Sequence, residues 1–206
     1  MILTIGIGKI IEKMIAIIDY GMGNLKSLSN ALSRLNIKSF LLNNSAEERK
    51  YTHIILPGVG SFPAAMSELK KRKLNDYMID KKNKNTPILG ICLGMQILAN
   101  LGKENQINTE GLNFIDGSIE NILDLDPLNK CHVGWNNVNF FSKSKIFDGI
   151  ENGANFYFDH SYYFKTRYKN NILCESNYTK NFTSGVFKDN LVGFQFHPEK
   201  SHSNGL

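Results

Sequence analysis

The sequence predicts an α/β protein with an open, mostly parallel central sheet that is flanked by helices and carries additional antiparallel strands. In the first half of the chain, short apolar runs rich in β-branched residues alternate with segments whose apolar residues recur at helical spacing. These runs are continuously apolar, as expected of parallel strands buried on both faces. After about residue 105, short strand-like segments are separated by Gly, Asn and Asp, which predicts the antiparallel additions.

The parallel part is predicted to contain four strands and three helices. Asn24 and Ser61 stand where the first two helices begin, and both residue types are good N-caps. In chain order these elements are a strand at 14–20, a helix at 25–35, strands at 37–42 and 52–58, a helix at 61–74, a strand at 86–92 and a helix at 93–101. The later strands are predicted within 111–122, 133–141, 155–164, 171–178, 183–188 and 191–198.

Length and composition fit one domain. The chain has 206 residues, of which 42% are hydrophobic and 21% charged. We assign residues 14–206 to a single domain and residues 1–13 to an extension ahead of the first strand. The net charge of +5 is too mild to predict a nucleic-acid partner. The basic run at 70–84 is better explained as a solvated helix face than as a nucleic-acid patch.

The cysteines and the N-terminus indicate the cellular compartment in which the protein is expected. Cys92, Cys131 and Cys174 make no disulfide framework, and no two of them have the spacing of a metal site. We therefore expect a reducing environment, no metal and no cofactor. The apolar N-terminus is interrupted by charges and has no cleavage site, and no uncharged apolar stretch is long enough to cross a membrane. The sequence thus predicts a cytoplasmic protein without a membrane partner.

The segment "GICLGMQIL" at 90–98 places Cys92 between two glycines, where a strand is expected to turn into a helix. The form G-x-C-x-G is the thiol counterpart of the nucleophile elbow of serine hydrolases, in which small residues make room for a strained turn. The start of a helix favours the thiolate form, and Gln96, one turn further, reaches the same ligand. The alternative is a buried cysteine that acts as a small hydrophobe.

His197 is the best candidate for a base that serves this thiol. It ends the apolar run "LVGFQFHPEK", and Pro198 keeps it out of helical conformation. Glu199, two residues on, lies on the same side of an extended chain and can orient the imidazole, as in a Ser-His-Asp triad. A strand-end histidine paired with a surface glutamate is the alternative. The other histidines are weaker candidates. His53 is expected to be structural and His202 to be solvated, whereas His132 and His160 could be either structural or functional.

The loop "LPGVGSF" at 56–62 is a candidate for the oxyanion hole. It follows a strand and precedes a helix, so it lies at the same carboxyl edge of the sheet as Cys92. Its glycines free backbone N–H groups for an anion, and the N–H of Val59 or Gly60 could act together with that of Leu93. An ordinary glycine-rich turn is the alternative interpretation of this loop.

Together these pieces resemble the class I (triad) glutamine amidotransferases, which have a flavodoxin-like fold. The segments "IIDYGMGNLKS", "LPGVGSF", "GICLGMQIL", "HVGWN", "NFYFDHSYYF" and "GFQFHPEKS" are similar, more narrowly, to the glutaminase subunits of imidazole glycerol phosphate synthases. The resemblance runs in register from about Met14 to the end. The chain differs from the family in two respects. The family usually continues into a final helix that this chain lacks, and its members seldom carry an N-terminal extension.

The resemblance implies hydrolysis of glutamine through a thioester on Cys92, with His197 as proton donor and Glu199 as its orienting group. It also implies a (β/α)₈-barrel cyclase partner that forms a heterodimer with the glutaminase and receives the ammonia for histidine biosynthesis. The residues that it implies for glutamine binding are Gly58, Val59, Gly60, Leu93, Gln96, Ser161 and Tyr162, and those near the partner are Asn24 and Lys200.

Two other functions remain compatible with the sequence. A paralogous glutaminase could supply ammonia to another synthase, such as a sugar-modifying enzyme, with the same catalytic residues. A non-enzymatic scaffold that retains the fold is disfavoured, because Cys92, His197 and Glu199 are all present.

Overall fold

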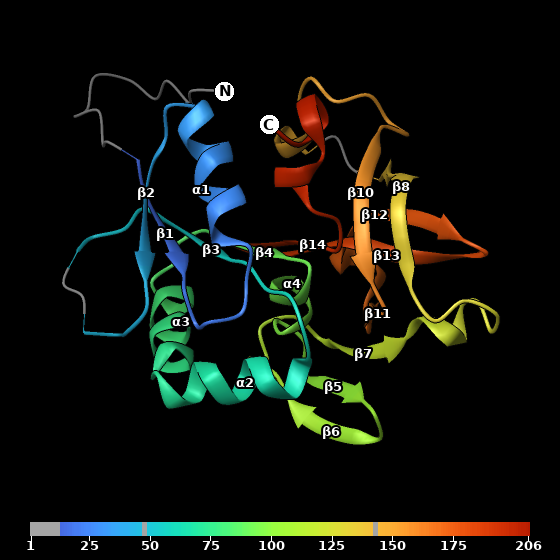
Figure 1. Cartoon of the computed structure of the whole chain (residues 1–206), viewed down its shortest axis with the longest axis horizontal. Helices are drawn as coiled ribbons and strands as arrows, with labels where there is room; N and C mark the ends of the chain where they lie inside the picture. Colours follow the sequence, from blue (N-terminus) through green and yellow to red (C-terminus); the bar gives the residue numbers. More distant parts are fainter. Residues whose placement is uncertain (1–12, 47–48, 142–143) are drawn as a thin grey trace.

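The computed structural model describes residues 13–46, 49–141 and 144–206, so the predicted N-terminal extension lies outside the described residues except for Lys13. The centre of the fold is a parallel sheet in the order β2-β1-β3-β4-β14 (Figure 1). The strands are β1 (Met14–Ile18), β2 (Lys38–Leu42), β3 (His53–Leu56), β4 (Ile88–Ile91) and β14 (Leu191–Phe194). The predicted parallel sheet is thereby confirmed.

Antiparallel strands extend this sheet beyond β14, as the second half of the sequence predicts. Within the described residues they continue the order as β13-β11-β7-β5-β6, with only β5 and β7 parallel to each other. Their bounds are Lys180–Lys188, Tyr162–Thr166, Gly117–Asn121, Leu101–Glu104 and Ile107–Glu110. Strands β12 (Ile172–Tyr178) and β9 (Asn139–Phe140) pair at the side of β13, and β8 (His132–Asn137) pairs with β10 (Asn155–His160) in a separate ribbon.

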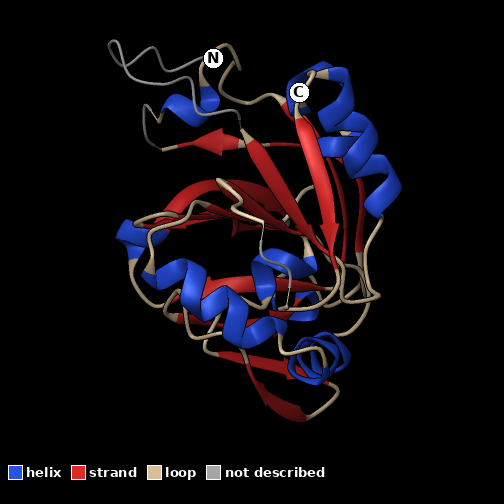
Figure 2. Ribbon diagram, turned by 90° about the vertical axis from the view of Figure 1, so that its left-hand side faces the viewer, coloured by secondary structure: helices blue, strands red, loops and turns tan. Residues whose placement is uncertain are grey.

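Helices cover both faces of the parallel strands (Figure 2). The helices are α1 (Leu25–Arg34), α2 (Phe62–Lys71), α3 (Leu74–Asn83) and α4 (Leu93–Gln96), with 3₁₀ turns η1 (Ile122–Asp124), η2 (Lys145–Phe147), η3 (Lys169–Asn171), η4 (Pro198–Lys200) and η5 (His202–Gly205). Successive residues of β1 point to opposite faces: Ile17 packs with Leu28 of α1, and Ile18 lies in the cluster that includes α2 and α3. None of the described helices is long and apolar enough to cross a membrane.

The predicted N-caps are confirmed. The Asn24 side chain accepts a hydrogen bond from the N–H of Ser27, and the Ser61 hydroxyl accepts one from the N–H of Ala64. The prediction of one helix at 61–74 is wrong in its length, because α2 ends at Lys71 and α3 begins at Leu74. Lys73 between them takes a left-handed conformation, with φ of 56°, which turns the chain.

The helix predicted at 93–101 is also much shorter, since α4 ends at Gln96. The carbonyls of Ile97 and Leu98 accept hydrogen bonds from the N–H groups of Leu112 and Phe114, at 2.8 and 2.9 Å, instead of continuing the helix. The segment after α4 is therefore fixed by tertiary contacts. The β5–β6 hairpin that follows was not predicted; its turn places Asn105 and Gln106 at positive φ.

Candidate active site

Cys92 occupies a strained turn between β4 and α4. It stands at the N-cap of α4 with φ of 54° and ψ of −113°, a conformation that side-chain-bearing residues rarely adopt. Its N–H donates to the carbonyl of Phe194 on β14 at 2.8 Å. A β-carbon at Gly90 would lie 2.6 Å from the Gly94 carbonyl oxygen, and one at Gly94 would overlap the backbone of Leu56. Both glycines of the predicted elbow are therefore needed for the chain to turn here.

Cys92 is only 5% exposed, and its thiol faces polar groups. The sulfur can donate to the carbonyl of Asp159, the last residue but one of β10, at 3.7 Å. The side-chain amide of Gln195 donates to the sulfur, also at 3.7 Å. The sulfur therefore lies at the end of the parallel sheet, between β10 and the segment that follows β14.

His197 and Glu199 form the predicted pair, and the structure shows that the pair is buried. Nδ1 of His197 lies 2.8 Å from Oε1 of Glu199, and the two side chains are 3% and 5% exposed. The position of the ring is fixed through the backbone, because the N–H of His197 donates to the carbonyl of Tyr157 and the Ser201 hydroxyl donates to the carbonyl of His197. The alternative of a strand-end histidine paired with a surface glutamate does not fit, because the Glu199 side chain is buried.

The electrostatics of His197 favour the protonated ring. Burial lowers the pKa of His197, but the Cys92 sulfur and the Glu199 carboxylate outweigh it and raise the pKa to about 9. Nε2 is buried and makes no hydrogen bond of standard geometry, while the sulfur is near enough to act on the charge of the ring. Nδ1 is held by Glu199, so Nε2 is the nitrogen that is free to serve the thiol.

Two cavities adjoin these residues, one of about 240 Å³ that is lined in part by Glu199 and one of about 260 Å³ that is lined in part by Cys92. The one beside Cys92, of about 260 Å³, is lined by seven residues of the predicted site: Val59, Gly60, Cys92, Leu93, Gln96, Ser161 and Tyr162. Three further residues line it that were not assigned to the site from the sequence: Glu104, Asp159 and His160. We call this the substrate cavity below.

Gly58 lies outside the substrate cavity and has a structural reason to be glycine. A β-carbon there would overlap the hydroxyl of Tyr20, which donates to the carbonyl of Pro57 at 2.9 Å. Burial, and to a lesser degree the charge of Cys92, raises the pKa of Tyr20, so its hydroxyl stays a donor. Tyr20 thus holds the predicted oxyanion loop in place through its hydrogen bond to Pro57. The sequence alone did not indicate this role.

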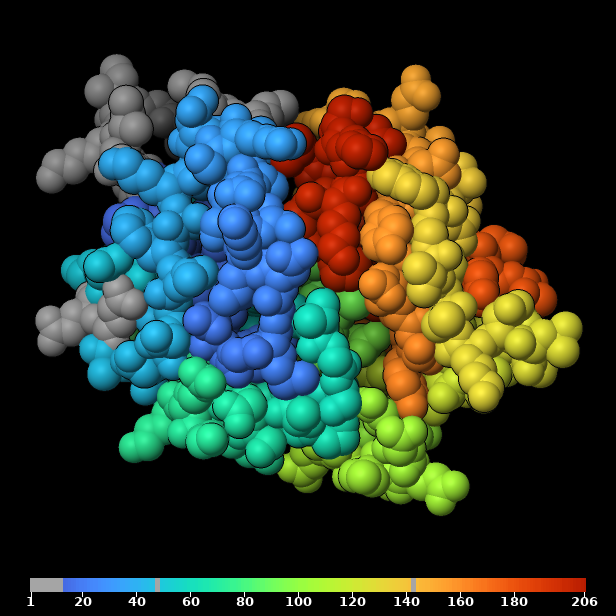
Figure 3. All heavy atoms as spheres, in the orientation of Figure 1, coloured from blue at the N-terminus to red at the C-terminus, as the bar shows by residue number. Residues whose placement is uncertain are grey.

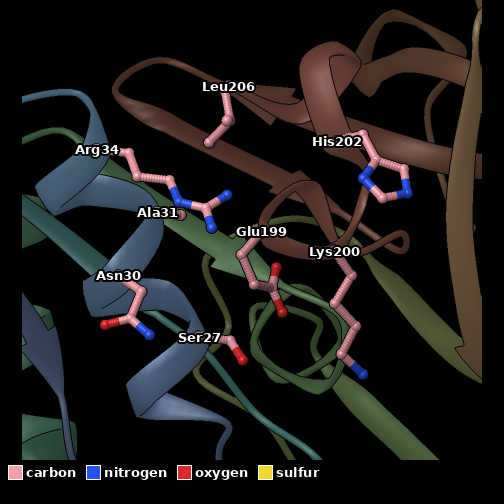
Figure 4. Close-up of a pocket in the computed structure, with 8 residues that line it drawn as sticks. All are labelled: Ser27, Asn30, Ala31, Arg34, Glu199, Lys200, His202 and Leu206. Atoms are coloured by element: carbon pink, nitrogen blue, oxygen red, sulfur yellow. The ribbon is translucent and has the colours of Figure 1, made fainter.

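The second cavity, of about 240 Å³, opens between α1 and the C-terminal turns (Figure 3). Figure 4 shows the carboxylate of Glu199 on the wall of this cavity, between the side chains of α1 and Lys200. Lys200 also lies 5.4 Å above the ring of Tyr157. Asn24 lines a smaller hollow together with His197 and Glu199. The two predicted partner-facing residues therefore lie beside the triad.

Two buried histidines support the wall of the substrate cavity. Nδ1 of His160 lies 2.9 Å from the carbonyl of Tyr162, and its Nε2 lies 2.9 Å from Nδ1 of His132. A carbonyl only accepts, so His160 carries its proton on Nδ1 and accepts at Nε2 from His132, whose Nε2 accepts from the amide of Asn136. This chain of donors holds only while both rings are neutral. His132 and His160, left open by the sequence, are therefore structural.

This histidine pair predicts a loss of stability in mild acid. Burial lowers the pKa of His132 to about 4; burial first, and then the charge of His132, lower the pKa of His160 to about 3. The unfolded chain takes up both protons near 6.5, so the free energy of unfolding should fall as the pH drops from about 6.5 to 5. His197 opposes this fall only near pH 6.5, where its unfolded form is half-protonated while its raised pKa keeps the folded form protonated; toward pH 5 it is protonated in both states. Urea titrations across this range measure the effect, and a constant free energy would contradict it.

In the described residues, no three His, Cys, Asp or Glu side chains are grouped so as to hold a metal ion. The site thus consists of a thiol, an imidazole–carboxylate pair and a polar cavity, a combination suited to transfer of an acyl group through a thioester.

The comparisons with known proteins first establish the class of protein to which the chain belongs. The family model described as glutamine amidotransferase class-I matches residues 16–205. Solved structures of similar fold include PurLQS from Thermotoga maritima, with a TM-score of 0.72, 18% identity and 91% and 88% of the two chains covered. A glutamine amidotransferase, also from Thermotoga maritima, has a TM-score of 0.66, with 19% identity and 91% and 76% of the two chains covered.

Similar proteins with assigned names identify a narrower family within this class. A protein of Methanococcus maripaludis named imidazole glycerol phosphate synthase subunit HisH 2 is 44% identical over 94% of this chain and 95% of its own length. The HisH subunit of Leptospira interrogans is 39% identical over 94% of this chain and 96% of its own. The chain therefore belongs to the class I glutamine amidotransferases and, within them, to the HisH glutaminase subunits of imidazole glycerol phosphate synthase.

Proposed function

We propose that Cys92, His197 and Glu199 hydrolyse glutamine in this protein and that the ammonia passes to a (β/α)₈-barrel cyclase partner. One observation carries the proposal: the thiol and the buried imidazole–carboxylate pair meet at the carboxyl ends of adjacent strands, β4 and β14, beside a polar cavity of about 260 Å³. Ligands of open α/β sheets bind at this edge. A cytoplasmic location is part of the proposal, because the mechanism needs a reduced Cys92.

The chemistry follows from the charges of the site. With the pKa of His197 near 9, the ring is an imidazolium at neutral pH and favours a thiolate on Cys92. The thiolate attacks the side-chain carbonyl carbon of glutamine, and His197 gives its proton to the departing ammonia. Water, deprotonated by His197, then cleaves the γ-glutamyl thioester to glutamate and restores the thiol.

Backbone N–H groups are proposed to stabilise the oxyanion of both tetrahedral intermediates. The N–H of Leu93 is in the first turn of α4 and has no acceptor within the helix. Val59 and Gly60 face the same cavity from the opposite loop, and Gly60 has φ of 106°, which a residue with a side chain would resist. Gln96, Ser161 and Tyr162 are proposed to position the substrate from the remaining walls.

Glu104 is proposed to bind the α-ammonium group of glutamine. It is the one side chain on β5 that reaches the substrate cavity among the residues described, and its carboxylate also accepts from the N–H of Phe62 at 2.6 Å. Replacing Glu104 by glutamine keeps an acceptor for Phe62 but removes the charge. We expect KM for glutamine to rise about tenfold with little change in kcat, since a hydrogen bond to a charged group is lost. Steady-state kinetics measure this, with Glu110→Gln on the exposed β6 as the matched control.

The partner is proposed to bind the face that carries α1, the C-terminal turns and the β8–β10 ribbon, which lie together in Figure 3. Val133 and Trp135 on β8 are 58% and 49% exposed, a large apolar exposure beside the active site. The ring of Trp135 stacks on His202 of η5, so this surface joins the wall of the cavity between α1 and the C-terminal turns. Relatives named as subunits of imidazole glycerol phosphate synthase support a synthase partner.

Release of glutamate from glutamine, with and without the barrel subunit from the source cell, tests this function. We expect slow hydrolysis by the isolated chain and faster hydrolysis in the complex. A diazoketone analogue of glutamine should add its mass to Cys92 and to neither Cys131 nor Cys174. Growth of a histidine auxotroph that carries the gene would identify the acceptor. No hydrolysis and no adduct, even in the complex, would reject the proposal.

A further inference from the structure

A fully buried amide lies behind the catalytic sulfur. Gln195 is 0% exposed and follows the last residue of β14. Its Nε2 donates to the Cys92 sulfur at 3.7 Å, and its Oε1 accepts from Nε2 of Gln96 at 3.0 Å. Gln96 in turn lines the substrate cavity. A buried polar side chain of this size costs free energy unless its groups are paired, and here both ends are paired with residues of the site.

The orientation of this amide is fixed by chemistry, starting from a carbonyl. The backbone oxygen of Tyr162 can only accept, so the atom of Gln96 that lies 2.9 Å from it must be the nitrogen. The second proton of that nitrogen points to Gln195, which must therefore present its oxygen. The other end of the Gln195 amide, the nitrogen, then faces Cys92. An inverted amide would place donor against donor at Gln96 and leave the sulfur without this donor.

We propose that Gln195 is a catalytic residue that donates to the sulfur of Cys92 and stabilises its thiolate. The proposal rests on the proposed function and adds to it a group outside the triad. The sulfur also lies 3.7 Å from the carbonyl of Asp159, an acceptor that favours the protonated thiol. Gln195 counteracts that preference, because a donor binds an anionic sulfur more strongly than a neutral one.

Two substitutions at Gln195 separate this role from packing. Gln195→Glu keeps the shape and an acceptor for Gln96 but places an oxygen against the sulfur, and Gln195→Met keeps the volume without a donor. Iodoacetamide alkylation, followed peptide by peptide by mass spectrometry from pH 5 to 9, reports the thiolate of Cys92 without requiring glutamine. The exposed Cys131 of the same molecules is the internal reference. Ser184→Ala, equally buried on β13, is the matched control, because the Ser184 hydroxyl bonds to Ser176 and Cys174 and not to the Cys92 sulfur.

We expect alkylation of Cys92 at pH 7 to slow about tenfold in Gln195→Met and further in Gln195→Glu, with the pH profile displaced upward. Cys131 in every variant, and Cys92 in Ser184→Ala, should react as in the unmodified protein. Unchanged alkylation of Cys92 in both folded variants would overturn the proposal. Because the assay contains no glutamine, slowed alkylation in a protein without glutaminase activity would reject the proposed function and leave this inference standing.

A measurement on variants of the thiol itself covers the case in which the Gln195 variants fail to fold. The side-chain amide of Gln195 gives resonances in a proton–nitrogen spectrum, and these should shift in Cys92→Ala because the sulfur acceptor is removed. They should stay in place in Cys131→Ala. Identical Gln195 amide resonances in Cys92→Ala and the unmodified protein would equally overturn the proposal.

Discussion

Replacing Cys92 with alanine should abolish glutamine hydrolysis, lowering kcat by about 10⁴-fold or more. The substitution removes the nucleophile of the proposed mechanism, and it leaves the imidazole of His197, its partner Glu199 and the cavity in place. Alanine keeps a β-carbon at φ of 54°, so the strained turn is the same in both proteins. Glutamate release in the presence of the barrel subunit measures the loss.

The control for this prediction is Cys131→Ala, which removes an exposed thiol outside the substrate cavity. It should hydrolyse glutamine at the rate of the unmodified protein. Thermal unfolding of the Cys92→Ala variant should show a cooperative transition, because the thiol makes few contacts that the fold needs. Hydrolysis at an undiminished rate in this folded variant would exclude a thioester mechanism.

The sequence predicts the parallel half of the fold well, because continuous apolar runs can only be satisfied by strands buried on both faces. The sequence-based prediction fails where long-range contacts determine the end of a helix. The residues after Gln96 have helical character, yet their carbonyls bond to Leu112 and Phe114, which are fifteen or more positions away. The end of α2 is likewise set by the left-handed Lys73, which no local pattern marks as a turn.

Within the site, the sequence predicts the residues that share a short motif. Cys92 is marked by its glycines and His197 by the neighbouring Pro198 and Glu199, and the structure brings the two segments together. Glu104 lies outside these motifs, and Gln195, although it lies in the same segment as His197, has no neighbour that marks it as a partner of the thiol. Gln195 acquires its role by contact with a sulfur 103 positions earlier in the chain, and Glu104 by the unpredicted hairpin that carries it into the cavity.

Gly94→Ala should have the largest effect on stability of these substitutions, lowering the free energy of unfolding by about 3 kcal/mol or more. Two effects oppose each other. Alanine is a better helix former than glycine by about 1 kcal/mol, which would stabilise α4. The new β-carbon, however, would overlap the backbone oxygen of Leu56, the last residue of β3, and backbone cannot turn aside as a side chain can. The collision prevails, and the turn that holds Cys92 must move.

The matched control is Gly23→Ala, in the loop before α1. Its β-carbon would meet side-chain atoms of Leu25 and Pro57 at 3.3 and 3.4 Å, so small adjustments suffice and a loss of about 1 kcal/mol or less is expected. Urea unfolding of both variants measures the difference, and glutamine hydrolysis by Gly94→Ala under native conditions should be lost with the geometry of Cys92. A Gly94→Ala variant as stable and active as the unmodified protein would show that the close approach of α4 to β3 does not require glycine at this position.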